Sequence, residues 1–164
     1  MKKIVSLCTA AVLCLSLLSA CASKQEKQVD LAAFAQTVQQ SHEFASLERA
    51  DPADQELGTI MLENNYPGLK DMDLEQVEVY LAMVSFSGGE LALVQAKSPE
   101  DAAKVKEIFQ ARIDTKSTDG PGNYPEEVEM WKRAAKVAEN GSYVMLVNHE
   151  DSQAIVDEFN ALFK

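Results

Sequence analysis

The chain has 164 residues, 46% of them hydrophobic and 25% charged, and its 15 basic side chains are outnumbered by 26 acidic ones. This length and composition fit one ordinary globular domain. The formal net charge of -11 argues against nucleic-acid binding, which needs clustered Lys and Arg, and against electrostatic adhesion to anionic lipid. Three cysteines fit neither a disulfide scaffold nor a four-ligand zinc site.

Residues 1–20 have the layout of a secretory signal peptide. Lys2 and Lys3 give a positive start, and a mainly apolar run from Ile4 to Leu18 follows, without an acidic residue. The run is too short and too interrupted for a membrane-spanning helix, which needs about 20 apolar residues. A basic start, a short apolar centre and small residues after it are typical of a signal peptide that is removed.

The apolar run ends in Leu18-Ser19-Ala20-Cys21. These four residues resemble the lipobox of bacterial lipoproteins, in which a large aliphatic residue and two small residues precede an obligatory cysteine. The resemblance implies that a diacylglycerol is attached to the sulfur of Cys21 and that the chain is cut between Ala20 and Cys21. Leu18, Ser19 and Ala20 would then be the residues that direct cleavage. The alternative is cleavage by the ordinary signal peptidase after Ala22.

Lipidation would give the protein its location. Two buried acyl chains hold a protein stably on a membrane, so the resemblance implies the outer face of the bacterial cytoplasmic membrane. The lipidated cysteine and a short polar linker would occupy residues 21–28, which as a coil reach on the order of 15 Å. Residues 29–164 would form one domain close to the lipid surface, with the membrane as a partner through the anchor.

Two helices are predicted at the start of this domain. Asp30 is a typical helix cap, and apolar residues follow it at helical spacing: Leu31, Phe34, Val38 and Ala45. Asp51-Pro52 predicts the start of a second helix that runs through Leu57, Ile60 and Met61 and ends at a turn cluster at 64–68. Asp73 to Gln76 predicts one short helical turn.

A hairpin and a helix are predicted next. Val77 to Phe86 and Glu90 to Lys97 read as strands, and Ser87-Gly88-Gly89 between them is a hairpin signal. Ser98 and Pro99 predict a helix start with a cap and a first-turn proline. The apolar stripe of that helix would be Ala102, Val105, Ile108 and Phe109.

The last third repeats this order after a loop from Thr115 to Pro125. Pro125 predicts the start of a helix that carries Val128, Trp131 and Ala135. The extended residues 136–139, the turn at Asn140-Gly141 and the strand Tyr143 to Asn148 predict a second hairpin. The final helix is marked by Ile155, Phe159 and Leu162.

The fold class predicted from these elements is α+β. Two ββα units, preceded by the N-terminal helices, would form one four-stranded antiparallel sheet with helices packed on one face. The other face would be left for the N-terminal helices or for a partner. The repeat fits a true duplication, and it fits equally the turns and caps that any strand-turn-helix unit needs. The sequence leaves both explanations open.

Four segments also resemble those of a known family. They are Tyr66-Pro67-Gly68-Leu69, Glu90-Leu91-Ala92-Leu93-Val94, Tyr124-Pro125-Glu126-Glu127 and Gly141-Ser142-Tyr143-Val144. Through most of residues 29–164 the chain is similar to the single-domain bacterial lipoproteins of domain-of-unknown-function family four-three-five-eight. It departs from the family at Leu69-Lys70-Asp71, where an Ile-Asp pair is expected. The resemblance implies a location and a fold, and it carries no activity.

Few residues predict chemistry. After lipidation of Cys21 the mature chain has no free thiol, which excludes thiol nucleophiles and thiolate metal sites. His42 is expected to be a helix side chain rather than a ligand. His149-Glu150-Asp151-Ser152 holds the residue types of a catalytic triad, but neighbours in sequence usually point apart, and helix capping accounts for Asp151 and Ser152. We therefore expect no catalytic residue, no metal ligand and no cofactor.

An acidic stretch, Asp71-Met72-Asp73-Leu74-Glu75, begins like an EF-hand loop. The sixth position is Gln76 instead of Gly and the twelfth is Ala82 instead of Glu, so the calcium geometry fails. Ser87-Gly88-Gly89 precedes a strand rather than a helix, which argues against a phosphate loop.

One local feature predicts a contact surface. The loop from Thr115 to Tyr124 lies shortly before Trp131, the single tryptophan, and a loop beside exposed aromatic residues is a typical binding surface. The alternative is that Trp131 fills the core. We expect a non-enzymatic module that binds a protein, a peptide or another envelope ligand. The alternatives are a carboxylate-dependent envelope hydrolase, suggested by the many acidic residues, and a structural spacer.

Overall fold

The computed structural model describes residues 27–54, 56–82, 89–118 and 124–164. The signal peptide, the lipobox and the tip of the first predicted hairpin therefore lie outside the described residues, as does most of the loop that leads to Tyr124. Among the residues that are described, no helix combines the length and the apolar character needed to cross a membrane.

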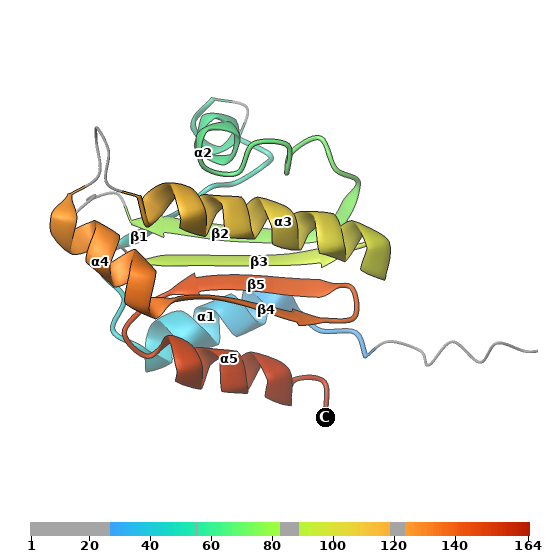
Figure 1. Ribbon diagram of the computed structural model, residues 1–164. Coiled ribbons are helices and arrows are strands. Elements are labelled where there is room, and N and C mark those ends of the chain that lie inside the picture. The colour runs from blue at the N-terminus through green and yellow to red at the C-terminus, as the bar shows by residue number, and fades with distance from the viewer. Residues whose placement is uncertain (1–26, 55, 83–88, 119–123) are drawn as a thin grey trace, which may run out of the picture.

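The centre of the domain is a five-stranded antiparallel sheet with the strand order β1-β2-β3-β5-β4 (Figure 1). Its strands are β1 Leu47–Arg49, β2 Leu74–Ala82, β3 Glu90–Ala96, β4 Ala135–Asn140 and β5 Tyr143–Asn148. The two predicted hairpins are β2–β3 and β4–β5, and they join where β3 pairs with β5. The α+β class and the antiparallel sheet are confirmed.

The predicted count of four strands is wrong, because β1 adds a fifth strand at the edge of the sheet beside β2. Two contacts fix it there. The guanidinium of Arg49 donates from Nε and from its second terminal nitrogen to the two carboxylate oxygens of Glu78, at 2.8 and 2.9 Å. The amide of Ala50 donates to the carbonyl of Val79 at 2.8 Å. Three residues are too few for a period-two pattern, so this segment carries no strand signal.

Helices cover both faces of the sheet, including the face that the sequence left for the N-terminal helices or for a partner (Figure 1). On one face lie α2 Leu57–Asn65, α3 Pro99–Lys116 and α4 Pro125–Ala134. On the other lie α1 Leu31–Ser41 and α5 Ser152–Ala161. The helices of the two ββα units, α3 and α5, therefore pack on opposite faces, which corrects the prediction that they share one face.

The central strands explain this arrangement. Every residue of β3 and β5 is buried, and nearly all of their side chains are apolar. Because successive side chains of a strand point to opposite faces, both faces of the sheet are apolar here. Ala92, Val94, Val144 and Leu146 pack under Val105 and Phe109 of α3 and Trp131 of α4. Leu91, Leu93, Met145 and Val147 pack under Phe34 and Val38 of α1 and Ile155 and Phe159 of α5. A sheet with two apolar faces needs a helical layer on each.

Two predicted helix caps and one predicted turn are confirmed. The carboxylate of Asp30 accepts from the amide of Ala33 at 3.0 Å, and Ser98 accepts from the amide of Asp101 at 3.1 Å. Gly141 takes a φ of 59° in the β4–β5 turn, where glycine has no Cβ to strain. Ala45, in contrast, lies beyond the end of α1 and is exposed, so its place in the helical stripe was wrongly predicted.

The second helix was predicted to begin too early. Asp51 forms a turn of its own, accepting from the amide of Ala53 at 2.9 Å, and α2 begins only at Leu57. Leu57 and Ile60, two apolar residues of this helix, are 51% and 53% exposed, while Leu62 is buried. Gly58 determines which side of α2 faces the turn at Asp51, because a Cβ on it would lie 2.0 Å from the carbonyl oxygen of Asp51. Only glycine allows the helix to pack this closely against that turn.

The short helical turn predicted at 73–76 is also wrong, because Leu74 to Gln76 already belong to β2. Leu74 pairs with Ala96, and the register shifts before Gln76 pairs with Gln95. The side chain of Gln76 also accepts from the amide of Leu31 at 2.9 Å, which ties the strand to the start of α1. This tertiary contact outweighs the capping pattern of the sequence.

Candidate functional site

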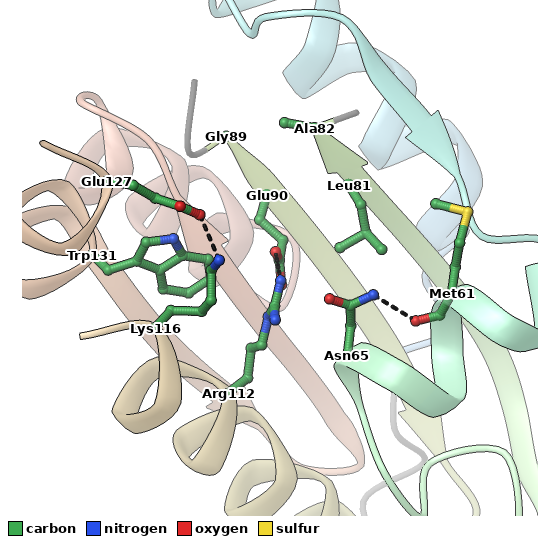
Figure 2. A pocket seen from close by; sticks show the side chains of 10 residues that line it. All are labelled: Met61, Asn65, Leu81, Ala82, Gly89, Glu90, Arg112, Lys116, Glu127 and Trp131. Carbon is green, nitrogen blue, oxygen red and sulfur yellow. Dashed lines mark hydrogen bonds and ion pairs between the residues drawn. The ribbon is translucent and has the colours of Figure 1, made fainter. Parts of the chain in front are cut away.

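A cavity of about 230 Å³ lies where α2, α3 and α4 meet the ends of β2 and β3 (Figure 2). Four ionisable side chains line it together with Trp131 and Asn65. They are Glu90, Arg112, Lys116 and Glu127. Such a concentration of charge beside the apolar core marks this cavity as the candidate site.

Helical and strand periodicity bring these side chains together. Glu90 opens β3 and, being two and four residues before Ala92 and Val94, projects toward the α3 face of the sheet. Arg112 and Lys116 are four residues apart near the end of α3, and Glu127 and Trp131 are four apart on α4. Residues at this spacing share one face of a helix, so both helices present a pair to the cavity.

Glu90 and Arg112 form a forked ion pair in this cavity (Figure 2). Nε of Arg112 donates to Oε1 at 3.0 Å, and a terminal nitrogen donates to Oε2 at 2.8 Å. The hydroxyl of Tyr66 also donates to Oε1 of Glu90. Both carboxylate oxygens of Glu90 are thus held by protein donors.

The surroundings of this pair shift the pKa values of its partners. Burial raises the pKa of the Tyr66 hydroxyl well above its usual value, and the charge of Glu90 adds to the effect. Burial works against the charge of Arg112, but the charge and hydrogen bonds of Glu90 outweigh it, so the pKa of the guanidinium is raised. Tyr66 stays a neutral donor and Arg112 stays a cation.

Arg112 is also stacked between aromatic rings. Its guanidinium carbon lies 5.4 Å from the ring centre of Trp131 and 5.8 Å from that of Tyr66. Cations at this distance are attracted to the electron-rich ring faces. The guanidinium therefore has few conformations open to it and forms a rigid wall of the cavity.

A second ion pair joins α3 to α4. Nζ of Lys116 lies 2.6 Å from Oε1 of Glu127, and both side chains are largely shielded from solvent. Figure 2 shows Lys116 reaching over the indole of Trp131 toward Glu127. The two acids and two bases of the cavity balance in formal charge.

Two buried polar atoms of the cavity residues have no hydrogen-bond partner within the described part of the chain. They are Nε1 of Trp131, which can only donate, and Oε2 of Glu127, which can accept. An unsatisfied buried polar atom costs about 1–3 kcal/mol. A bound group that accepts from the indole and donates to the carboxylate would remove this cost.

This arrangement fits binding better than hydrolysis. Cleavage of a glycoside by the two-carboxylate route needs two carboxylates that can act on the substrate. Here both oxygens of Glu90 are engaged, and Oε1 of Glu127 is paired with Lys116. One carboxylate oxygen is left to meet a ligand.

Of the two residues predicted for a contact surface, Trp131 is buried and Tyr124 is exposed. Trp131 is 1% exposed, packs in the core and borders the cavity, which is the alternative that the sequence left open. Tyr124 is 54% exposed at the N-terminus of α4. A partner bound through Tyr124 stays a prediction. Leu18, Ser19, Ala20 and Cys21 lie outside the described residues.

Sequence reasoning missed four cavity residues, although a signal was present. Val105, Phe109, Arg112 and Lys116 follow one another at spacings of four, three and four, so the two cations continue the buried stripe of α3. Glu127 likewise neighbours Val128 on the inner side of α4. Charges on an apolar stripe are the pattern that indicates a buried ion pair.

A different group of residues has the chemistry of a metal site. His42, His149 and Asp151 each place a ligand-type atom within 4.8 Å of the others, on the α1 and α5 side of the sheet. The acidic stretch at 71–75 forms no such group: Asp73 is paired with Lys97 at 2.5 Å.

Comparison with known proteins gives one match. Residues 50–149 match the model of a family described as Domain of unknown function (DUF4358). The matched range contains every residue that lines the cavity. The search of curated proteins and the search of solved structures returned no match.

Proposed function

Because the chain belongs to the DUF4358 family, whose description assigns no activity, we propose a function from its cavity. The protein is a non-enzymatic, lipid-anchored module outside the cytoplasmic membrane that binds an uncharged, amide-bearing group of an envelope peptide. The bound group enters the cavity between α3, α4 and β3. The rest of the peptide lies outside it.

The unpartnered pair of polar atoms carries this proposal. Nε1 of Trp131 needs an acceptor, and Oε2 of Glu127 needs a donor. A primary amide, as in the side chain of Asn or Gln, offers a carbonyl oxygen and an N–H within one small planar group. It would satisfy both atoms at once.

Charge and size support a small neutral group. The cavity holds two carboxylates and two cations, so a charged ligand would leave one charge without compensation. Its volume of about 230 Å³ is below the roughly 300–1,000 Å³ typical of sites that enclose a whole small molecule. A single side chain fits this space better than a complete metabolite.

Placement at the membrane rests on the lipobox. Lipidation of Cys21 would hold the domain near the lipid surface despite its excess of acidic over basic side chains, which anionic lipid repels. Peptides of the envelope would then be its nearest ligands.

Fluorescence of the only tryptophan provides the test, because Trp131 lies in the cavity wall. The full-length protein in detergent is titrated with blocked tripeptides of the form Ac-Ala-Xaa-Ala-NHCH₃, where Xaa is Gln, Asn or Leu, so that only the Xaa side chain can supply a primary amide. The Gln or Asn peptide should change the emission saturably, and the Leu peptide should not. No saturable change with any of them, up to millimolar concentration, would contradict the proposal.

Two matched variants locate the site. Glu127→Leu should weaken binding by roughly tenfold or more, the loss expected when a buried hydrogen bond to a charged group is removed. Glu129→Gln changes an exposed acid on the same helix and should bind like the wild type. Mass spectrometry of the peptides after incubation separates binding from hydrolysis, since cleaved peptide would favour the hydrolase alternative.

A further inference from the structure

A second site is formed by side chains far apart in sequence. His42 is the residue after α1, His149 follows β5, and Asp151 stands immediately before α5. One ligand-type atom from each lies within 4.8 Å of the other two. These are the only two histidines of the chain, so their meeting is a clear structural feature.

Both imidazoles turn the same nitrogen toward Asp151. Nδ1 of His42 lies 3.1 Å from Oδ2 of the Asp151 carboxylate. Nδ1 of His149 accepts a hydrogen bond from the backbone amide of Asp151 at 3.0 Å. Both Nδ1 atoms therefore lie beside Asp151, that of His42 at its carboxylate and that of His149 at its backbone amide.

The opposite nitrogens are held by acceptors. Nε2 of His42 lies 3.3 Å from Oε1 of Glu158, and Nε2 of His149 lies 3.3 Å from the carbonyl oxygen of Glu43. Histidines that bind metals almost always donate their second N–H to a carboxylate or a backbone carbonyl, which fixes the tautomer. Both histidines already have the outer partner that such a ligand requires.

Asp151 is not used as the sequence predicts. It stands at the cap position of α5, yet its side chain makes no hydrogen bond to the helix amides, whereas Asp30 and Ser98 cap their helices. Its carboxylate contacts His42 instead. Helix capping therefore does not explain this aspartate, and the expectation drawn from the sequence is corrected.

We propose that Nδ1 of His42, Nδ1 of His149 and the carboxylate of Asp151 bind a divalent transition-metal ion of the zinc type. Two imidazoles and one carboxylate suit Zn²⁺ or Co²⁺ and not Mg²⁺ or Ca²⁺, which prefer oxygen ligands. Ligands about 2.0–2.1 Å from a tetrahedral ion lie roughly 3.3 Å apart, close to the present separation of His42 and Asp151. The ion displaces the proton between those two groups and the amide hydrogen bond to His149.

Access and rigidity agree with this site. The Asp151 side chain is 58% exposed and that of Glu158 is 44% exposed, so solvent reaches the ion and can occupy its fourth position. His149 is buried and lies 4.3 Å, centre to centre, from the ring of Phe44. The ion would link the end of α1 to the start of α5, the two helices that cover this face of the sheet.

The test uses the full-length protein in detergent, freed of metal with a chelator. Titration with Co²⁺ should produce the visible absorption of a tetrahedral site at one ion per chain, and calorimetry with Zn²⁺ should give the same stoichiometry. Asp151→Asn should weaken binding by roughly tenfold or more, and Glu158→Gln, which removes an outer partner, by about tenfold. Asp157→Asn, an exposed acid on the same helix, is the matched control and should bind like the wild type.

Nuclear magnetic resonance of the unmodified protein avoids any variant that fails to fold. With only two histidines, Zn²⁺ should shift the ring signals of both in proportion to the bound fraction. Absence of a one-to-one complex would overturn the proposal. So would binding that leaves either ring unshifted, or binding that Asp151→Asn and Asp157→Asn weaken equally.

Discussion

Arg112 on α3 and Glu90 on β3 face each other through two parallel hydrogen bonds with only 12% and 4% of their side chains exposed. Removing two such charges from water costs several kcal/mol for each ion, and an apolar pair of similar volume often packs as well or better. The pair is therefore a weak contributor to net stability. Its position in the wall of the cavity suits a role in shaping that cavity.

Removing only one partner of this ion pair should destabilise the protein. Arg112→Met keeps the length of the side chain and leaves the buried carboxylate of Glu90 without its cation. We expect the free energy of unfolding to fall by about 3–5 kcal/mol, the usual cost of an uncompensated buried charge. Urea denaturation followed by circular dichroism measures it.

The double variant Glu90→Gln/Arg112→Met supplies the comparison. The neutral amide can still accept from Tyr66, and no charge is left alone, so most of the lost stability should return. A double variant as unstable as Arg112→Met would show that packing of the guanidinium against Tyr66 and Trp131 matters more than charge balance.

The sequence predicted the parts of the fold that depend on local chemistry. The caps at Asp30 and Ser98, the first-turn Pro125 and the Asn140-Gly141 turn act over a few residues, and each lies where it was expected. The predicted elements were wrong where a contact between residues far apart in sequence determines the local structure. Arg49 pairs with Glu78 at the edge of the sheet, and Gln76 accepts from the amide of Leu31 at the start of α1. Neither contact produces a periodic pattern in the sequence.

The same difference between local patterns and distant contacts applies to the two candidate sites. Arg112 and Lys116 could have been recognised as charges on the buried stripe of α3, although the stripe alone does not name Glu90 and Glu127 as their partners. His42 and His149 are separated by most of the domain, and each alone resembles an ordinary side chain. Only the packing of α1 against α5 brings them together.

The face of α2 that is buried gives a direct stability prediction. Leu62 is buried against the core, so Leu62→Ala should lower the free energy of unfolding by about 2–5 kcal/mol. Ile60→Ser, at a position 53% exposed, should change it by less than about 0.5 kcal/mol. Chemical denaturation of both variants compares them, and equal losses would contradict the burial of Leu62 and the exposure of Ile60.

Gly58→Ala should reverse the usual effect of this substitution in a helix. Alanine is normally favoured over glycine in a helix by about 0.8–1.0 kcal/mol. Here the new Cβ would lie 2.0 Å from the carbonyl oxygen of Asp51, a backbone atom that cannot rotate away. We expect a net destabilisation and separation of α2 from the preceding turn, measured as a lower melting temperature.

Gly89→Ala is the control for that experiment. Its Cβ would meet Phe44 and Leu47 at 3.5 and 3.6 Å, which is ordinary contact, so its melting temperature should stay close to that of the wild type. If Gly58→Ala proved at least as stable as the wild type, the close approach of α2 to Asp51 would be wrong.

Cys21→Ser tests the anchor. A thioether to diacylglycerol needs the cysteine sulfur, so in a bacterial host the variant should lose incorporation of labelled palmitate and be released from the membrane fraction or remain unprocessed. Cys14→Ser, which changes a cysteine inside the segment to be removed, should be lipidated normally. The mass of the mature wild-type protein separates the two cleavage routes, because the lipoprotein begins with a lipidated Cys21 and the other product begins with unmodified Ser23. Normal processing and membrane retention of Cys21→Ser would contradict the lipobox assignment, and the domain would then need another means of reaching the lipid surface that its acidic side chains disfavour.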